Sequence, residues 1–506
     1  MSSLNTDSKM KLDRLLEGVR YRASMPMSTG FDGLASDSRD VRPGQIFACI
    51  EAGDLGASYV TEALGKGAVA ALVEESSSVQ GGQIVGVENL GENLSQIAGN
   101  FYGHPSQHLA VVGVTGTNGK STVCSWIEQL LELSGRAAGS IGTLGVHVRG
   151  EQLIEPDGMT TRDAVRAQQV LKFCRDAGAE AIAMEVSSHG MHQHRVESIC
   201  FGVALFTNFS RDHLDYHETE NEYWQAKRRL FDLPGIRCAV VNFDDPKGRE
   251  LSDELESSME LIRFSIEGRQ QADIYLTEVE LDQGFRARLN SKWGCSDIYV
   301  PQMTAEFELS NMLAALAATC YLGVPLEQAV SKLAELQPAR GRLELVGSFN
   351  ESKIYVDYAH TPDAVTRVLS ALKATTTNQL ICVLGCGGDR DAGKRPLMAQ
   401  AALHESDRLV ITSDNPRGEA QDQIERDMLR GVEDLTKVDA IQDRRAAIKF
   451  AIENAGENSC IAVLGKGHEV GQIFADRLEA FSDIDVVKEL LEELRLETST
   501  RGGSES

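Results

Sequence analysis

A short glycine-bearing segment between an apolar run and a helical pattern restricts the fold of this chain more than any other feature. Leu109–Val114 predicts a buried strand, Thr115–Ser121 (TGTNGKS) follows as a turn, and a helical pattern continues through Leu131. A strand, a turn and a helix N-terminus in this order bind phosphate, because backbone N–H groups and the helix dipole point at the anion. Lys120 would add a positive charge, and Ser121 a hydroxyl for Mg²⁺. The segment therefore predicts a nucleotide-binding α/β unit.

The turn departs from the strict P-loop pattern at one position. The glycine expected five residues before Gly119 is absent, and Val114 stands there. An accidental Gly-Lys-Ser turn is the alternative interpretation, but it leaves the strand and the helix on either side unexplained. That context favours a phosphate site, although the motif alone identifies a nucleotide and not a reaction.

The length of 506 residues exceeds one ordinary core, and three domains are expected. We place them at residues 1–107, 108–338 and 339–496, followed by a Gly/Ser-rich tail, 497–506, that we expect to be disordered. The predicted fold is α/β throughout. It comprises a small N-terminal α/β domain, a central P-loop-type domain with a mostly parallel sheet, and a C-terminal Rossmann-like α/β domain.

Apolar runs that end in polar residues support this division, as is typical of parallel sheets with ligands at their carboxyl ends. Strands are expected at Gln45–Ile50, Val69–Val73, Ala181–Glu185, Gly202–Thr207, Cys238–Asn242, Lys353–Asp357, Gln379–Leu384, Arg408–Thr412 and Ser459–Leu464. Helices are expected at Leu90–Tyr102, Ser310–Tyr321 and Asp485–Leu496. The less regular stretch 262–301 predicts strands added to the central sheet.

Charge and composition disfavour several classes of protein. The net charge of -25 argues against nucleic-acid binding, which needs clustered Lys and Arg. The N-terminus has no apolar core of signal-peptide length, and no stretch supplies the roughly 20 apolar residues of a membrane helix. The ten cysteines are scattered, and Cys382 and Cys386 are expected as small buried residues. A cytoplasmic location, no membrane insertion and a monomer are expected.

The residues of the phosphate loop, together with four later motifs, resemble the sequence motifs of the Mur ligase family. The motifs are Glu185-Val-Ser-Ser-His189, Thr207-Asn-Phe-Ser-Arg-Asp-His-Leu-Asp-Tyr-His217, Asp357-Tyr-Ala-His-Thr-Pro362 and Gly465-Lys-Gly-His-Glu469. They follow the family's order along the whole chain up to the tail. The family also lacks the glycine that Val114 replaces, so that departure becomes a family feature.

The resemblance implies ATP-dependent amide ligation with Mg²⁺, in which ATP activates a carboxylate as an acyl phosphate that an amine then attacks. It implies ATP-binding roles for Gly116, Thr117, Asn118, Gly119, Lys120, Ser121, Thr122, Asn311, Arg342 and Asp357. The implied catalytic residues are Lys120, Glu185, His213 and Lys227, and the implied metal site combines Ser121, Glu185, His213 and Lys227 as a carbamate. Spacing alone would make Lys227 an ordinary solvated helix lysine.

The motifs also suggest the substrates, most closely those of family members that build the peptidoglycan stem by adding diaminopimelate to UDP-N-acetylmuramoyl-L-alanyl-D-glutamate. Residues expected to bind this acceptor are Ser38, Thr160, Thr161, Ser188, Gln193 and Arg195. Two segments depart from the family pattern: Gly53–Ser58, where Asp-Gly-His is usual, and Arg162, where a proline is usual.

The motif Asp414-Asn-Pro-Arg417 indicates which amino acid is expected as a substrate. Lysine and meso-diaminopimelate differ by one distal carboxylate, and Arg417 could bind it through two parallel hydrogen bonds. The resemblance implies a pocket of Arg390, Asp414, Asn415, Pro416, Arg417, Gly465 and Glu469, with Glu469 on the distal ammonium. Val470-Gly-Gln472 replaces the usual Asp-Tyr-Gln.

Three alternatives remain open from sequence. A folylpolyglutamate or cyanophycin synthetase is disfavoured by Asp37-Ser-Arg39 and by the Asp414–Arg417 motif. A non-catalytic nucleotide-binding paralogue is disfavoured because Lys120, Glu185 and Lys227 are all present. A specialised ligase that uses lysine, or another amino acid or acceptor, fits the departures from the family pattern.

Overall fold

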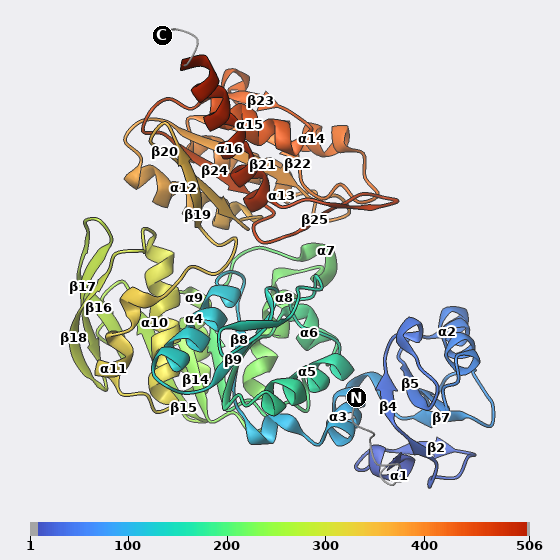
Figure 1. Cartoon of the computed structure of the whole chain (residues 1–506). Coiled ribbons are helices and arrows are strands. Elements are labelled where there is room, and N and C mark those ends of the chain that lie inside the picture. The colour runs from blue at the N-terminus through green and yellow to red at the C-terminus, as the bar shows by residue number, and fades with distance from the viewer. Residues whose placement is uncertain (1–8, 503–506) are drawn as a thin grey trace.

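A computed structural model describes residues 9–502, with side chains through residue 497 (Figure 1). Three separate sheets of five, eleven and six strands form the centres of three α/β units, one in each of the expected regions. The C-terminal unit lies above the central unit in Figure 1. The N-terminal unit lies beside the central unit, and its helix α3 (Leu90–Tyr102) lies where these two units meet. Within residues 9–502, no helix is long and apolar enough to cross a membrane.

The N-terminal unit is a sheet in the order β2-β7-β6-β5-β4. Its strands are β2 (Tyr21–Ala23), β4 (Gly33–Ala35), β5 (Gln45–Cys49), β6 (Ala70–Glu74) and β7 (Ile84–Val87). All neighbours are parallel except β2 and β7. Helix α2 (Gly53–Gly65) follows β5, and α3 ends at Gly103, whose left-handed φ of 74° terminates the helix.

The central unit has a long sheet in the order β11-β10-β9-β12-β8-β13-β14-β15-β16-β17-β18. The strands are β8 (Ala110–Thr115), β9 (Ala138–Gly142), β10 (Gly145–Val148), β11 (Glu151–Ile154), β12 (Ala181–Glu185), β13 (Val203–Phe206), β14 (Cys238–Asn242), β15 (Glu260–Ser265), β16 (Ile274–Leu281), β17 (Phe285–Ser291) and β18 (Gly294–Val300). Its neighbours from β9 to β16 are parallel, and both edges are antiparallel hairpins.

Helices bury both faces of this sheet. Helices α4 (Lys120–Leu133) and α10 (Glu306–Tyr321) pack on one face, and α5 (Ala164–Asp176) packs on the other. Such double coverage explains why β8, β12 and β14 are apolar along most of their length instead of alternating. The polar residues at the ends of β8, β12 and β13 therefore lie together at the carboxyl edge of the sheet.

The C-terminal unit has the strand order β19-β20-β24-β21-β22-β23, parallel except for β19. The strands are β19 (Glu344–Phe349), β20 (Ser352–Asp357), β21 (Leu380–Cys386), β22 (Arg408–Ser413), β23 (Val438–Ala440) and β24 (Cys460–Leu464). Helices α12 (Pro362–Thr375), α13 (Lys394–Glu405) and α14 (Gln421–Leu429) cover one face, and α15 (Arg444–Asn454) and α16 (Asp483–Gly502) cover the other. Cys382 and Cys386 are buried in β21, as expected.

The predicted disordered tail is partly wrong. Helix α16 continues beyond Leu496 to Gly502, so residues 497–502 are helical, while 503–506 lie outside the described residues. Glu497 faces Lys449 of α15, with 3.8 Å between its carboxylate and the amine. The composition of the tail does not reveal this continuation of the helix or its ion pair with α15.

A fully buried ion pair joins the two helices on this face. Arg444 donates to Asp483 through Nε and Nη2, both at 2.7 Å, and the two side chains are 0% exposed. We expect Arg444→Met to destabilise the C-terminal unit by about 3–5 kcal/mol, because it leaves Asp483 as an uncompensated buried charge. Arg445→Met is the matched control: it removes only partly exposed pairs and should cost about 1 kcal/mol or less. Urea unfolding would compare them, and equal losses would contradict the prediction.

Candidate active site

The phosphate loop joins β8 to α4, and its two glycines are required by close contacts. Gly116 has a φ of 143°, and a Cβ there would lie 2.0 Å from Oγ1 of Thr207. Gly119 has a φ of 86°, and a Cβ there would lie 2.4 Å from Oδ1 of Asn311. Both conformations favour glycine. Asn311, expected on the adenine side, is thus packed against the loop from the first turns of α10.

Two lysine amines bind the carbonyl groups of this loop. Lys120 donates to the carbonyls of Thr117 at 2.8 Å and Gly116 at 3.0 Å, and Lys227 donates to Gly116 at 2.7 Å. Lys227 is only 1% exposed, so it is not a solvated helix lysine. Burial lowers the pKa of Lys227 well below its usual value, and the neighbouring charge of Lys120 lowers that pKa further. Lys120 itself also has a lowered pKa, mainly because it is buried.

Helix α8 (Glu220–Arg228) holds Lys227 in place. Thr219 caps the helix by accepting from the N–H of Glu222 at 3.2 Å, which fixes its start. Tyr223 lies one turn before Lys227, and the amine sits 4.4 Å from the centre of its ring. The buried face of this helix therefore directs the amine at the phosphate loop.

Glu185 ends β12 and faces a group of threonines. Its Oε1 accepts from the backbone N–H of Thr143 at 2.9 Å, and its Oε2 accepts from the hydroxyl of the same residue at 3.2 Å. The hydroxyl oxygen of Thr143 lies 3.0 Å from that of Thr160 and can accept a hydrogen bond from it, and Thr161 donates to the carbonyl of Glu185 at 3.0 Å. The expected metal ligand and the two acceptor-binding threonines therefore belong to one network. Thr143 is a member that the sequence interpretation missed.

The segment after β13 brings His213 to the same edge. His213 has a left-handed φ of 53°, and its ring centre lies 4.8 Å from that of His189. Burial lowers the pKa of His213 to about 3, so the imidazole is neutral and can act as a ligand. Burial alone would raise the pKa of the neighbouring Asp212, but the nearby imidazole of His360 and the charge of Lys394 lower that pKa well below its usual value.

The remaining acceptor-binding candidates lie on α6 (Ser188–His192) and just after it. Gln193 accepts from Nε of Arg195 at 3.0 Å and donates to the hydroxyl of Tyr216 at 2.9 Å, while Arg195 also donates to the carbonyl of Thr161. Ser188 is 1% exposed, and among the described residues its hydroxyl has no hydrogen-bond partner. A ligand hydroxyl or carboxylate could supply that partner.

A cavity of about 100 Å³ lies between the phosphate loop and the C-terminal unit. Its lining includes Asn118, Thr122, Asn311, Arg342 and Asp357. Arg342 donates to the hydroxyl of Ser121 at 3.0 Å. The carboxylate of Asp357 accepts from the N–H groups of Leu343 at 2.6 Å and Ala359 at 2.7 Å. Six of the residues expected to bind ATP, from both units, therefore line one cavity, while Gly116, Thr117, Lys120 and Ser121 are not part of its lining.

The expected amino-acid pocket forms beyond β22 and β24. Glu469 accepts from Asn415 at 2.8 Å and from Lys466 at 2.7 Å, so the carboxylate expected to bind an ammonium already has a protein cation beside it. Lys466 is 0% exposed and was missed in the sequence interpretation. A Cβ on Gly465 would lie 2.7 Å from Oδ2 of Asp414, which explains the glycine.

Arg417 occupies a turn with a left-handed φ of 53°. Its Nη1 donates to the carbonyl of Gly388 at 2.9 Å, and among the described residues it forms no ion pair. Burial lowers its pKa, and the neighbouring charge of Arg390 lowers that pKa further. Pro416 lies between Arg417 and Asn415, so the whole Asp414–Arg417 motif stands in one loop.

Ser38, expected to contact the nucleotide sugar, lies in the N-terminal unit. Its hydroxyl donates to Glu62 at 2.7 Å, and its carbonyl accepts from Lys66 at 3.0 Å. Asp37 accepts from the N–H of Arg39 at 2.8 Å and pairs with its guanidinium. Ser38 is therefore held in a rigid turn, apart from the central cavity.

The three segments that depart from the family pattern have defined positions in the structure. Gly53 starts helix α2 with a φ of 67°. Arg162 is 2% exposed, and its Nε lies 3.0 Å from Asp157, so it fixes the segment before Thr160 and Thr161. Gln472, in the altered Val470–Gln472 segment, donates to the carbonyl of Asp414 at 2.7 Å and thereby supports the amino-acid loop.

Comparison with known families assigns the class. The Mur ligase middle domain matches residues 114–319, and the Mur ligase glutamate ligase domain matches residues 341–467. The chain belongs to the Mur ligase family. It is therefore an ATP- and Mg²⁺-dependent amide ligase, and its phosphate loop is the nucleotide site that this activity needs.

Its relatives carry more specific names. A Pseudomonas aeruginosa protein is 41% identical over 464 residues, covering 90% of this chain and 94% of the relative. A Coxiella burnetii protein is 38% identical, covering 90% and 95%. Both are named UDP-N-acetylmuramoyl-L-alanyl-D-glutamate--2,6-diaminopimelate ligase. A solved structure of that ligase is 32% identical with a TM-score of 0.68, covering 96% of this chain and 100% of that one.

More distant structures share the fold. MurF from Acinetobacter baumannii is 19% identical with a TM-score of 0.66 and covers 96% of this chain. Folylpolyglutamate synthase from Mycobacterium tuberculosis, in complex with ADP and AMPPCP, is 19% identical with a TM-score of 0.60 and covers 73% of this chain. The three-unit α/β architecture is confirmed by these neighbours.

Proposed function

We propose that this ligase joins meso-2,6-diaminopimelate to UDP-N-acetylmuramoyl-L-alanyl-D-glutamate at the expense of ATP, in the synthesis of the peptidoglycan precursor. One observation carries the chemistry: Lys227 presents a buried amine to the carbonyl of Gly116, with no carboxylate partner among the described residues. A lysine amine with a lowered pKa is the form that can take up CO₂ as a carbamate. The names of the relatives support the choice of substrates.

The three units divide the work in this proposal. Residues 1–107 bind the nucleotide sugar through Ser38, residues 108–338 bind ATP and carry out ligation, and residues 339–496 bind the amino acid. The hydroxyl and the carbonyl of Ser38, which bind Glu62 and Lys66 in this structure, are the groups that would contact the uracil. We propose that the chain works as a monomer in the cytoplasm, where ATP is available.

The first chemical step would be transfer of the γ-phosphoryl group. A carboxylate oxygen of the dipeptide attacks the γ-phosphorus, ADP leaves, and an acyl phosphate results. Lys120 and Arg342 lie beside the loop as cations for the transferring charge, while Arg195 and the threonines 160 and 161 would hold the dipeptide. In such transfers, precise positioning of the reacting groups supplies most of the rate enhancement.

The donor set around the loop fits Mg²⁺. Glu185, the hydroxyl of Ser121 and a carbamate on Lys227 would offer the oxygen ligands that this ion prefers, with the neutral imidazole of His213 as a further ligand. Bound there, Mg²⁺ would neutralise phosphate charge and lower the barrier to transfer. In the second step the amine of the amino acid attacks the acyl carbon, phosphate leaves, and the amine loses a proton.

The choice of amino acid would be made by Arg417. Its guanidinium is half-buried and not engaged in an ion pair among the described side chains, so the distal carboxylate of meso-diaminopimelate can pair with it. Asn415 and Arg390 would contact the rest of the amino acid. Glu469 would bind the distal ammonium next to Lys466.

The proposal is tested by measuring phosphate release with purified protein, ATP, the UDP-muramoyl-dipeptide and a panel of amino acids. We expect release only when all three substrates are present, with meso-diaminopimelate far above lysine. The mass of the product would show one added diaminopimelate. Equal rates with lysine and meso-diaminopimelate would contradict the specificity, and release without an acceptor would contradict the ligation.

A further inference from the structure

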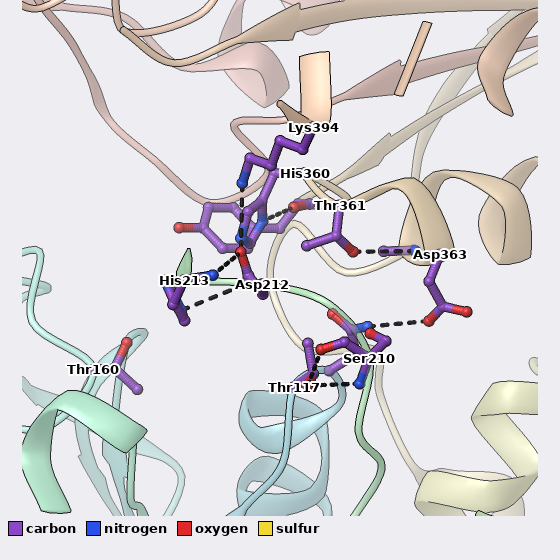
Figure 2. A network of polar contacts seen from close by, with 12 residues as sticks. Thr117, Thr160, Ser210, Asp212, His213, His360, Thr361, Asp363 and Lys394 are labelled. Carbon is purple, nitrogen blue, oxygen red and sulfur yellow. Dashed lines mark hydrogen bonds and ion pairs between the residues drawn. The ribbon is translucent and has the colours of Figure 1, made fainter. Parts of the chain in front are cut away.

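Asp212 stands at the junction between the central and C-terminal units and is contacted from both (Figure 2). Its Oδ1 lies 3.5 Å from the amine of Lys394, and its Oδ2 lies 3.7 Å from Nε2 of His360. Both partners belong to the C-terminal unit: Lys394 begins α13, and His360 follows β20. The side chain of Asp212 is 5% exposed, so this contact is buried between the units.

A buried carboxylate is stable only with partners. Its desolvation costs several kcal/mol unless cations and hydrogen-bond donors compensate for the lost water. Within the described residues, the side chains within ion-pair distance of Asp212 outside its own segment, Lys394 and His360, both come from the C-terminal unit. The charges of Lys120 and Lys227 act on it from the central unit without direct contact. The environment that holds Asp212 is therefore complete only when the two units are together.

Asp212 also holds His213. Its Oδ1 accepts from the backbone N–H of His213 at 2.9 Å, and its Oδ2 lies 3.4 Å from Nε2 of the same imidazole. The backbone of His213 is left-handed, a conformation that needs support from its surroundings. A carboxylate at one ring nitrogen fixes the tautomer and the ring orientation of a metal-binding histidine and leaves the other nitrogen free.

We propose that Lys394 and His360 are positioning residues that act through Asp212, so that His213 is oriented as a ligand only after the C-terminal unit closes on the central one. The inference rests on the proposed function for the role of His213. It assigns Lys394 a task that differs from binding the amino acid or ATP. The resulting chain of contacts runs from Lys394 and His360 to Asp212, and from there to the ring of His213.

A second pair across the same junction gives a matched control. Arg211 lies 3.5 Å from Asp391, and the side chain of Arg211 is 44% exposed. Arg211→Met would remove a contact between the same two units without touching the carboxylate of Asp212. Lys394→Met, His360→Gln and Asp212→Asn would each interrupt the chain of contacts at a different point, and Lys394→Arg would retain the cation.

Mn²⁺ binding without turnover tests the proposal directly. Each variant is titrated with Mn²⁺ in the presence of a non-hydrolysable ATP analogue, and bound metal is followed by electron paramagnetic resonance. We expect Lys394→Met and His360→Gln to weaken Mn²⁺ binding by about 10–100-fold, the usual cost of removing an outer partner of a metal ligand. Lys394→Arg should recover most of the affinity, and Arg211→Met should stay within about 2-fold of the parent protein.

A double-mutant cycle then distinguishes an effect of Lys394 that is transmitted through Asp212 from a general disturbance of the structure. If Lys394 acts through Asp212, Lys394→Met should change Mn²⁺ affinity by less than about 2-fold when Asp212→Asn is already present. Additive losses, unchanged Mn²⁺ affinity in Lys394→Met, or an equal loss in Arg211→Met would each overturn the proposal. The titration needs neither acceptor nor amino acid, so it does not depend on the ligase assay, which tests the proposed function separately.

Discussion

Lys227→Ala should reduce ligase turnover by at least about 10³-fold, with only small changes in the KM values for ATP and the acceptor. The amine of Lys227 is buried against the phosphate loop, and its pKa is lowered mainly by burial. Those conditions favour the neutral amine that forms a carbamate and so becomes an anionic ligand. Alanine removes that anion without changing the loop glycines or Lys120. Turnover would be measured as phosphate release at saturating substrates.

Chemical rescue distinguishes a carbamate from a structural lysine. Added formate or acetate should restore part of the activity of Lys227→Ala, because a short carboxylate can occupy the space of the missing anion. Lys247→Ala is the matched control, since Lys247 lies at the surface beside Trp224 and pairs with Glu250. It should remain fully active. Full activity of Lys227→Ala without rescue would remove the carbamate from the mechanism.

Arg417→Met should abolish the preference for meso-diaminopimelate over lysine. A site built around a charge-assisted pair can favour its proper substrate by about 10⁴-fold, because the analogue leaves buried polar groups unpaired. Arg417 supplies the cation, and its contacts with the carbonyls of Gly388 and Asn415 orient it without neutralising it. Without the guanidinium, kcat/KM for meso-diaminopimelate should fall by at least about 10³-fold, while the low rate with lysine should change little.

Two further variants define the contribution of Arg417. Arg417→Lys keeps the charge but loses the planar fork, so we expect it to recover only a small part of the preference. Arg408→Met is the matched control, because Arg408 begins β22, at the opposite end from the Asp414–Arg417 loop, and pairs with Asp439 of β23. It should leave kcat/KM for both amino acids unchanged. If Arg417→Met kept its preference for meso-diaminopimelate over lysine, another group would have to bind the distal carboxylate.

Much of the fold follows from apolar runs in the sequence. The strands at Ala181–Glu185 and Cys238–Asn242 and the helix at Leu90–Tyr102 were predicted with their observed bounds. The two strands are apolar on both sides and end abruptly in polar residues, and the helix repeats apolar residues along one face, which makes all three easy to recognise. The antiparallel hairpins at 138–154 were not predicted, because their glycines and mixed polarity give no clear alternation.

Helix α10 shows why a boundary was misplaced. The apolar pattern begins near Ser310, but the helix starts at Glu306. Glu308 accepts from the N–H groups of Thr304 at 2.8 Å and Ala305 at 2.9 Å, so a carboxylate in the first turn starts the helix early. Capping by a side chain leaves no trace in the pattern of hydrophobicity.

The site was predicted in part. The motif order identified the loop, the strand-end carboxylate Glu185 and the Asp414–Arg417 loop, and the structure gathers these groups at adjoining edges. Their roles remain predictions. Lys466 beside Glu469, and Asp212 beside Lys394, were missed. The second pair joins residues that are far apart in sequence and depends on the placement of two units, which no local pattern encodes.

The buried pair of Arg444 and Asp483 has a consequence for where the amino-acid-binding unit ends. The family match stops at residue 467, yet Asp483 lies beyond it and begins the helix that covers one face of the C-terminal sheet. A fragment cut at the end of the match would leave Arg444 without its counter-ion and expose the apolar face under α16. The folding unit therefore extends beyond residue 467, and truncation or domain exchange should preserve α16.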